Sequence, residues 1–157
     1  MTGLELGGPA PDFTLRDQFG QDVTLSSYQG SKAVAILFYP YAFSGVCTGE
    51  MTGVRNRLDE FLTFETEVLA ISCDPVYALR AFADQDGLNF PLLSDFWPHG
   101  EVARAYGAFD ELHGCPVRSS YLLDTEGIVR WSLHHPSGQG RDPGEYVAAI
   151  AALGAGT

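Results

Sequence analysis

The fold is decided by residues 33–50, which read AVAILFYPYAFSGVCTGE. Ala33–Phe38 is a continuous apolar run, as a strand buried on both faces shows. A helix is predicted over residues 45–62, because apolar side chains recur there at helical spacing, at Val54, Leu58, Phe61 and Leu62. A buried strand that leads directly into a helix is typical of an open α/β sheet, where ligands bind outside the carboxyl ends of the strands.

Predicted strands and helices alternate along the rest of the chain. Two hairpins are expected, over residues 12–25 and 119–134, each around a turn that contains glycine. Asp74 and Pro75 are expected to open a helix, with Asp74 as its cap. Further strands are predicted at 68–72 and 91–94, and further helices at 99–105 and 145–153. This order predicts an α/β fold with a mixed central sheet, helices on both faces and an N-terminal hairpin.

Composition and charge narrow the class of protein. The chain has 157 residues, the size of one ordinary domain, so residues 1–157 are expected to form a single domain. With 9 basic and 20 acidic residues, the net charge of −11 repels nucleic acid and anionic membrane surfaces. The N-terminal residues lack the basic start and apolar run of a secretory signal, and no apolar stretch is long enough to cross a bilayer. We therefore expect a cytoplasmic protein.

The residues after the first buried strand carry the chemistry. Cys47 is expected in the first turn of its helix, where backbone N–H groups have no partner within the helix and the helix dipole is positive. Both effects favour a thiolate, which is the nucleophilic form of cysteine. Ser44 is placed to hydrogen-bond a molecule bound beside the sulfur, and Pro40 ends the strand and restricts access. Two alternatives stay open: Cys47 as a buried apolar residue, and Ser44 as an N-cap only.

This segment resembles the active-site motif of the peroxiredoxins, in which proline, threonine or serine, and cysteine stand at the spacing of Pro40, Ser44 and Cys47. The resemblance extends over nearly the whole chain, and residues 94–100, SDFWPHG, are most similar to the one-cysteine E-type alkyl hydroperoxide reductases. It implies a thioredoxin-like fold and a thiol-dependent peroxidase. It also implies that Arg118 is the family's catalytic arginine.

The resemblance implies a reaction as well. The Cys47 thiolate attacks hydrogen peroxide, an organic hydroperoxide or peroxynitrite and becomes a sulfenic acid. Ser44, Arg118 and the N–H groups near Cys47 hold the two oxygens, with Val46 and Glu50 as supporting residues. No cofactor is needed. No metal is expected either, because the spacing of the four histidines does not match a metal site. They are His99, His113, His134 and His135.

The sulfenic acid must then be reduced by a thiol. Cys73 is expected to be buried, and Cys115 is a candidate resolving cysteine three residues before Arg118. The E-type resemblance instead implies an external reductant: a low-molecular-weight thiol similar to mycothiol, with a glutaredoxin-like or thioredoxin-like partner. It also implies a homodimer or higher homo-oligomer. Two other functions stay open, namely a thiol–disulfide oxidoreductase, which Glu50 in place of a second cysteine disfavours, and a redox sensor.

Overall fold

The computed structural model describes residues 4–135 and 140–155. Its main sheet has seven strands in the order β2-β1-β5-β4-β3-β8-β9. The strands are β1 (Thr14–Arg16), β2 (Asp22–Thr24), β3 (Ala33–Phe38), β4 (Thr66–Ser72), β5 (Leu92–Ser94), β8 (Ser119–Leu123) and β9 (Val129–His134). Three central strands, β3, β4 and β5, are parallel, and the outer strands pair antiparallel, so the predicted mixed sheet with an N-terminal hairpin is confirmed.

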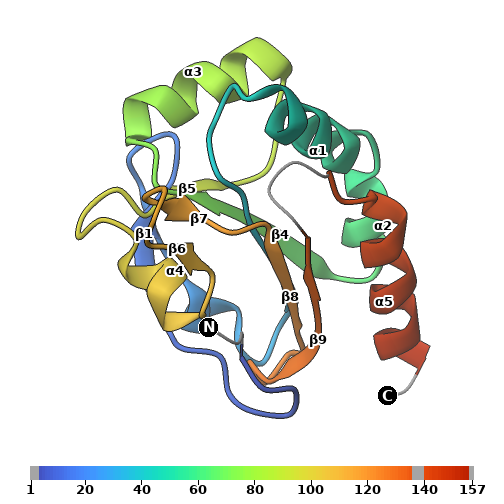
Figure 1. Ribbon diagram of the computed structural model, residues 1–157. Coiled ribbons are helices and arrows are strands. Elements are labelled where there is room, and N and C mark those ends of the chain that lie inside the picture. Colours follow the sequence, from blue (N-terminus) through green and yellow to red (C-terminus); the bar gives the residue numbers. More distant parts are fainter. Residues whose placement is uncertain (1–3, 136–139, 156–157) are drawn as a thin grey trace.

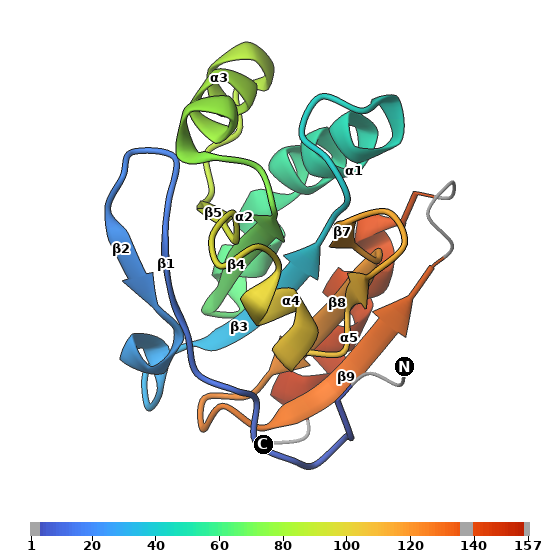
Figure 2. The same ribbon diagram turned by 60° about the vertical axis from the view of Figure 1, so that its left-hand side comes forward.

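Helices cover the two faces of this sheet unequally (Figure 1). One face carries four of them, α1 (Gly45–Asn56), α2 (Leu58–Thr63), α3 (Val76–Asp86) and α5 (Pro143–Ala155). The other face carries α4 (Glu101–Ala105) and the 3-10 helix η1 (Leu25–Tyr28). Figure 2 shows the β1–β2 hairpin at one edge of the sheet and β9 at the other. No helix in the described ranges is both long and apolar enough to cross a membrane.

Buried apolar side chains form two hydrophobic cores, one on each face of the sheet, and the apolar run of β3 contributes to both. Ala35 and Leu37 point into the core beneath α1, α3 and α5, whereas Val34, Ile36 and Phe38 point into the core beneath α4. This alternation follows from the period of two along a strand. Because both faces of β3 are buried, the strand has no polar side and its register beside β4 and β8 is strongly specified.

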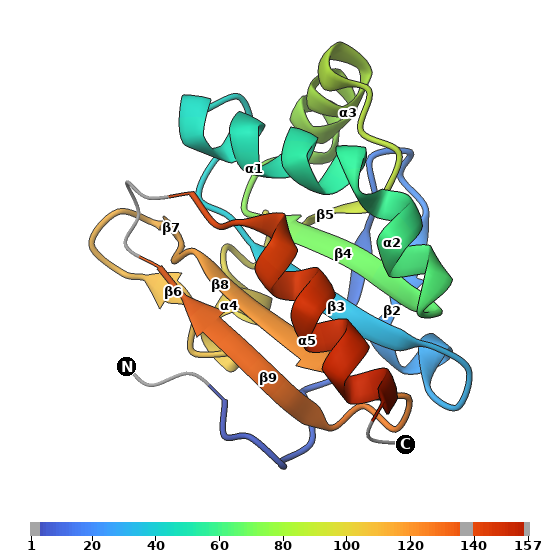
Figure 3. The same ribbon diagram turned by 90° about the vertical axis from the view of Figure 1, so that its right-hand side faces the viewer.

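Two local predictions were wrong, and one element of the fold was not predicted. The helix expected over residues 45–62 is broken at Arg57, whose φ of −118° is not helical, and the chain continues as the short helix α2, which Figure 3 shows at an angle to α1. Asp74 does not cap α3, because Pro75 is the N-cap residue and no side chain bonds to that helix end. A small second sheet, β6 (Phe109–Asp110) with β7 (Cys115–Pro116), was not foreseen.

Candidate active site

The turn between β3 and α1 places Cys47 at a helix start. After Phe38, the buried residues Tyr39 and Pro40 end the strand, and α1 begins at Gly45. Ser44 is the N-cap of α1, and its hydroxyl accepts a hydrogen bond from the backbone N–H of Cys47 at 3.2 Å. The N-cap interpretation of Ser44 is therefore correct in geometry. The hydroxyl proton stays available to donate to a bound molecule.

A carboxylate from the neighbouring strand fixes this turn. Asp74, two residues after the end of β4, accepts a hydrogen bond from the backbone N–H of Ala42 at 2.8 Å and one from the Ser72 hydroxyl at 2.7 Å. Phe43, which follows Ala42, has a φ of 69°. This left-handed conformation costs a non-glycine residue about 1–3 kcal/mol. Asp74 thus holds a strained turn instead of capping α3.

Arg118 reaches the sulfur from the other side. Phe38 of β3 pairs with Ser119 of β8, so the residue before Ser119 lies beside the end of β3. Arg118 is 2% exposed, and its Nη2 donates to Cys47 Sγ at 3.2 Å. A guanidinium stays charged at any physiological pH and therefore stabilises a thiolate at this distance.

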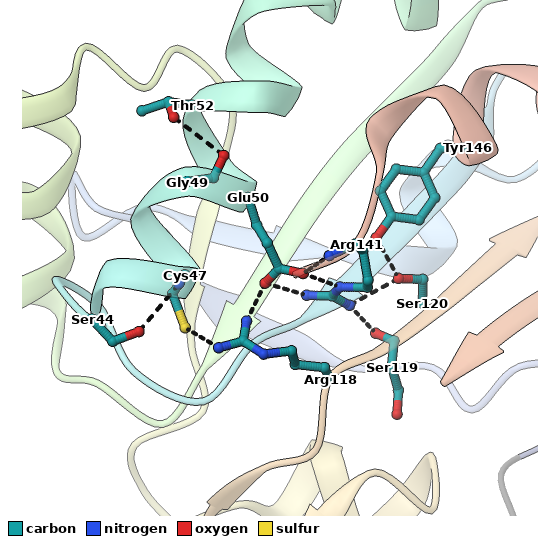
Figure 4. Close-up of polar contacts among 10 residues, drawn as sticks. All are labelled: Ser44, Cys47, Gly49, Glu50, Thr52, Arg118, Ser119, Ser120, Arg141 and Tyr146. Atoms are coloured by element: carbon teal, nitrogen blue, oxygen red, sulfur yellow. Dashed lines mark hydrogen bonds and ion pairs between the residues drawn. The ribbon is translucent and has the colours of Figure 1, made fainter. Parts of the chain in front are cut away.

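Glu50 links Arg118 to a second buried arginine (Figure 4). It lies one helical turn after Cys47, and its Oε1 is paired with Arg118 Nη1. Its Oε2 accepts from Arg141 Nε at 2.6 Å and from the Arg141 backbone N–H at 2.8 Å. Two guanidiniums and one carboxylate leave this buried group with one excess positive charge, which a thiolate at Cys47 neutralises.

Sequence reasoning missed Arg141. It lies just before α5, in a stretch rich in glycine and proline that was expected to be a loop, and no local pattern marks it as functional. Of that stretch, residues 136–139 lie outside the described residues. Arg141 is nevertheless only 4% exposed and makes its polar contacts with α1 and β8. Its place in the site follows from tertiary packing alone.

A cleft opens beside the buried sulfur. It has a volume of about 460 Å³ and is lined in part by Pro40, Ser44, Val46 and Arg118. Cys47 itself is fully buried and does not line it. Four residues expected to act together, Pro40, Ser44, Cys47 and Arg118, therefore lie close to one another, and Ser44 and Arg118 both line the cleft and hydrogen-bond to Cys47.

The other two cysteines lie in less favourable surroundings. Burial, followed by the carboxylates of Asp95 and Asp74, raises the pKa of Cys73 to about 12. Cys115 lines the cleft but is 5% exposed, and burial raises the pKa of its thiol although a hydrogen bond with Tyr41 lowers it. All three cysteines are free thiols. In the part of the chain that the structure describes, no group of three or more His, Cys, Asp or Glu side chains could hold a metal ion.

Comparison with known proteins identifies the family of the chain. Residues 6–132 match the model of the AhpC/TSA family. The chain is 46% identical to alkyl hydroperoxide reductase E of Mycobacterium tuberculosis over 150 residues, which is 96% of this chain and 98% of that protein. It is 35% identical to a putative peroxiredoxin in the rubredoxin operon of Clostridium pasteurianum, over 96% of this chain and 90% of that protein.

Solved structures give the same answer for the fold. The crystal structure of peroxidoxin BcpB from Mycobacterium tuberculosis superposes with a TM-score of 0.85 at 29% identity, over 96% of this chain and 98% of that chain. AhpC of Enterococcus faecalis superposes with a TM-score of 0.86 at 28% identity, over 94% of this chain and 91% of that chain. The thioredoxin-like fold expected from the active-site segment is thereby confirmed. The chain belongs to the AhpC/TSA family of peroxiredoxins.

Proposed function

We propose that this chain is a thiol-dependent peroxidase with Cys47 as its nucleophile. The observation that carries the proposal is the hydrogen bond from Arg118 Nη2 to Cys47 Sγ, 3.2 Å long, within a buried group that carries one excess positive charge. Catalysis of this kind needs a stabilised thiolate and donors aimed at the developing charge. The names of the relatives, alkyl hydroperoxide reductase and peroxiredoxin, support the same activity.

In the proposed reaction the Cys47 thiolate attacks one oxygen of a hydroperoxide, ROOH. The S–O bond forms as the O–O bond breaks, and the other oxygen leaves as RO⁻ and takes a proton from water. Cys47 is oxidised to a sulfenic acid and the peroxide is reduced to an alcohol, or to water when the substrate is hydrogen peroxide. Arg118 and the Ser44 hydroxyl hold the peroxide oxygens in line, and Pro40 and Val46 shape the approach from the cleft.

An external thiol completes the proposed cycle. It attacks the sulfenic acid and releases water, and a second thiol then breaks the mixed disulfide and returns Cys47 to its reduced form. The raised pKa of Cys115 argues against this residue as the resolving thiol, because a neutral thiol attacks slowly. We assign the reduction to a low-molecular-weight thiol similar to mycothiol, working with a glutaredoxin-like or thioredoxin-like protein.

The rest of the proposed biology follows from the family. The chain works as one domain over residues 1–157, in the cytoplasm, and pairs as a homodimer. Exposed aromatic side chains support pairing, since Phe43, Phe96 and Trp97 are 45%, 48% and 82% exposed.

Stopped-flow oxidation of the reduced protein by hydrogen peroxide tests the activity. Oxidation much faster than that of free cysteine is expected, lost in Cys47→Ser and kept in the matched variant Cys73→Ser. Consumption of many equivalents of peroxide per chain, with mycothiol or a glutaredoxin and its reducing system present, is expected of an enzyme. Consumption of a single equivalent would leave a redox sensor, and oxidation no faster than that of free cysteine would end the proposal.

A further inference from the structure

Buried hydrogen bonds extend from the active site to the C-terminal helix. Arg141 Nη1 donates to the hydroxyl of Ser120 on β8 at 2.8 Å, and that hydroxyl lies 2.9 Å from the Tyr146 hydroxyl on α5. Figure 4 shows Tyr146 pointing toward Ser120 and Arg141. Ser120 and Tyr146 are 1% and 4% exposed, so neither can exchange this partner for bulk water.

The two ends of the Arg141 guanidinium are held by different groups. Nε and Nη2 donate to Glu50 at 2.6 and 3.2 Å, whereas Nη1 donates to the Ser119 carbonyl at 3.0 Å and to the Ser120 hydroxyl. The Ser119 carbonyl belongs to the backbone of β8, which is paired on both sides. The Ser120 hydroxyl can rotate, and its direction is set by what it bonds on its far side, which is Tyr146.

Tyr146 is itself firmly placed. Its ring packs against Trp131 at 5.8 Å and Phe61 at 6.4 Å between ring centroids. Burial raises the pKa of Tyr146 to about 12 although nearby Arg141 lowers it, so the phenol keeps its proton over the physiological range. The hydrogen bond to Ser120 therefore persists at any pH at which the enzyme works.

We propose that Ser120 and Tyr146 are positioning residues for peroxide reduction, which fix Arg141 and, through Glu50, the guanidinium of Arg118 on the Cys47 sulfur. The proposal rests on the peroxidase function proposed above. The coupling runs through one shared carboxylate: Glu50 holds Arg118 with Oε1 and Arg141 mainly with Oε2. A shift of Arg141 therefore moves the carboxylate that orients Arg118, and small misplacements at a reacting centre slow catalysis.

The test compares two reactions of the same sulfur. Both reactions are measured at a pH at which the Cys47 thiol is fully ionised in every variant, so that a change in thiolate stability affects neither rate. Hydrogen peroxide then still needs its oxygens oriented by Arg118, whereas iodoacetamide needs only the thiolate. For Tyr146→Phe we expect a loss of about three- to tenfold in the rate of oxidation by peroxide, the size of one ordinary hydrogen bond. Ser120→Ala is expected to lose about tenfold by the same reasoning, because Arg141 then loses a partner directly. Alkylation by iodoacetamide should change less than about twofold in both variants.

Two further variants separate positioning from general loosening of the fold. Tyr121→Phe is the matched control, because Tyr121 is an equally buried tyrosine of β8 whose hydroxyl donates to the Tyr106 carbonyl at 2.8 Å in the other core. It should lower the melting temperature as much as Tyr146→Phe, by about 2–4 °C, with no change in the peroxide rate. Ser120→Thr keeps the hydroxyl and adds one methyl group, and Ser120 borders a small apolar cavity of about 10 Å³. Unlike Ser120→Ala, this variant should oxidise at the wild-type rate.

The outcomes are distinct. Wild-type peroxide rates in both Tyr146→Phe and Ser120→Ala would overturn the inference, and so would equal losses in the peroxide and iodoacetamide reactions. A wild-type protein that peroxide oxidises no faster than free cysteine would instead remove the proposed function itself.

Discussion

Cys47 and Cys73 both lie at the carboxyl-end edge of the central sheet, and both are buried, with exposures of 0% and 7%. The prevailing charge near the two thiols is opposite in sign, although Arg104 partly offsets the carboxylates near Cys73. Cys47 lies in the first turn of α1 and accepts a hydrogen bond from Arg118, whereas Cys73 lies near the carboxylates of Asp95 and Asp74, which join burial in raising its pKa to about 12. Position and burial are thus shared, and the charge around the sulfur decides which cysteine can react.

The two sites also differ in how their charges are held. Asp95 accepts backbone hydrogen bonds from Val102 and Ala103 at 3.1 and 2.9 Å, so the negative charge near Cys73 is tied to the start of α4. Arg118 is tied instead to Glu50, and Glu50 to Arg141. The carboxylate of Asp95 thus stabilises the start of α4. Arg118 and Arg141 together carry one positive charge more than Glu50 neutralises, and a thiolate at Cys47 balances it.

The largest expected effect is the difference in alkylation between Cys73 and an ordinary thiol. A pKa of about 12 leaves a thiolate fraction near 10⁻⁴ at pH 8, about three orders of magnitude less than free cysteine has. Since a raised pKa delays ionisation as pH rises, the rate at Cys73 should increase about tenfold per pH unit up to about pH 11. Iodoacetamide labelling of Cys47→Ser, followed by peptide mapping, measures the rate of alkylation at Cys73. Ready labelling of Cys73 at pH 7 would contradict the comparison.

Removing the Arg118 guanidinium should make Cys47 as unreactive as a buried cysteine that lacks a neighbouring cation. Arg118→Met is expected to slow oxidation by hydrogen peroxide about 10²–10³-fold, the range for loss of one donor to developing charge. Stopped-flow rates measure the loss. Arg130→Met is the control, because Arg130 forms an exposed ion pair with Asp124 at 2.7 Å on β9 and should leave the rate unchanged. A change below fivefold in Arg118→Met would show that the guanidinium is not needed.

Glu50→Gln tests the carboxylate that joins the two arginines. It leaves two buried guanidiniums without their counter-ion, which should lower the free energy of unfolding by about 3–5 kcal/mol. Misplacement of Arg118 should also slow oxidation about 10- to 100-fold. Urea denaturation and stopped-flow oxidation measure the two effects. A variant with full stability and full rate would mean that the ion pairs contribute to neither.

The smallest expected effect concerns the cap. Ser44→Ala removes the acceptor for the Cys47 N–H and the hydroxyl that faces the cleft, and should cost about 1 kcal/mol of stability. The rate of oxidation should fall about fivefold, as expected for one lost hydrogen bond. Ser44→Thr keeps the hydroxyl and should preserve both quantities. An unchanged oxidation rate in Ser44→Ala would leave Ser44 as a cap alone.

Local signals in the sequence sufficed for one half of the site. Pro40, Ser44 and Cys47 share one turn between a buried strand and a helix, so their spacing alone brings them together. Arg118 needed the family resemblance, because its place beside Cys47 follows from the pairing of β3 with β8. Arg141 carried no signal, since it reaches the site only when the segment before α5 folds against Glu50.

The errors in the fold have a similar origin. The order of strands and helices follows from apolar periodicity, and most of it was predicted. The break at Arg57 is invisible to periodicity, because Leu58 and Phe61 keep the helical spacing across it. An aspartate before a proline is a common start of a helix. The carboxylate of Asp74 nevertheless accepts its hydrogen bond from the Ala42 N–H at the edge of the sheet and not from the start of α3. In each case a tertiary contact or a backbone angle overrides the local pattern.

The most direct test is to treat the reduced protein with one equivalent of hydrogen peroxide, trap sulfenic acid with dimedone and locate it by peptide mass spectrometry. The surroundings of the three cysteines predict label on Cys47 alone, with Cys73 and Cys115 still thiols. Label on Cys73, or a disulfide between Cys47 and Cys115 as the first product, would contradict the conclusion that charge selects Cys47 and leaves the other two inert.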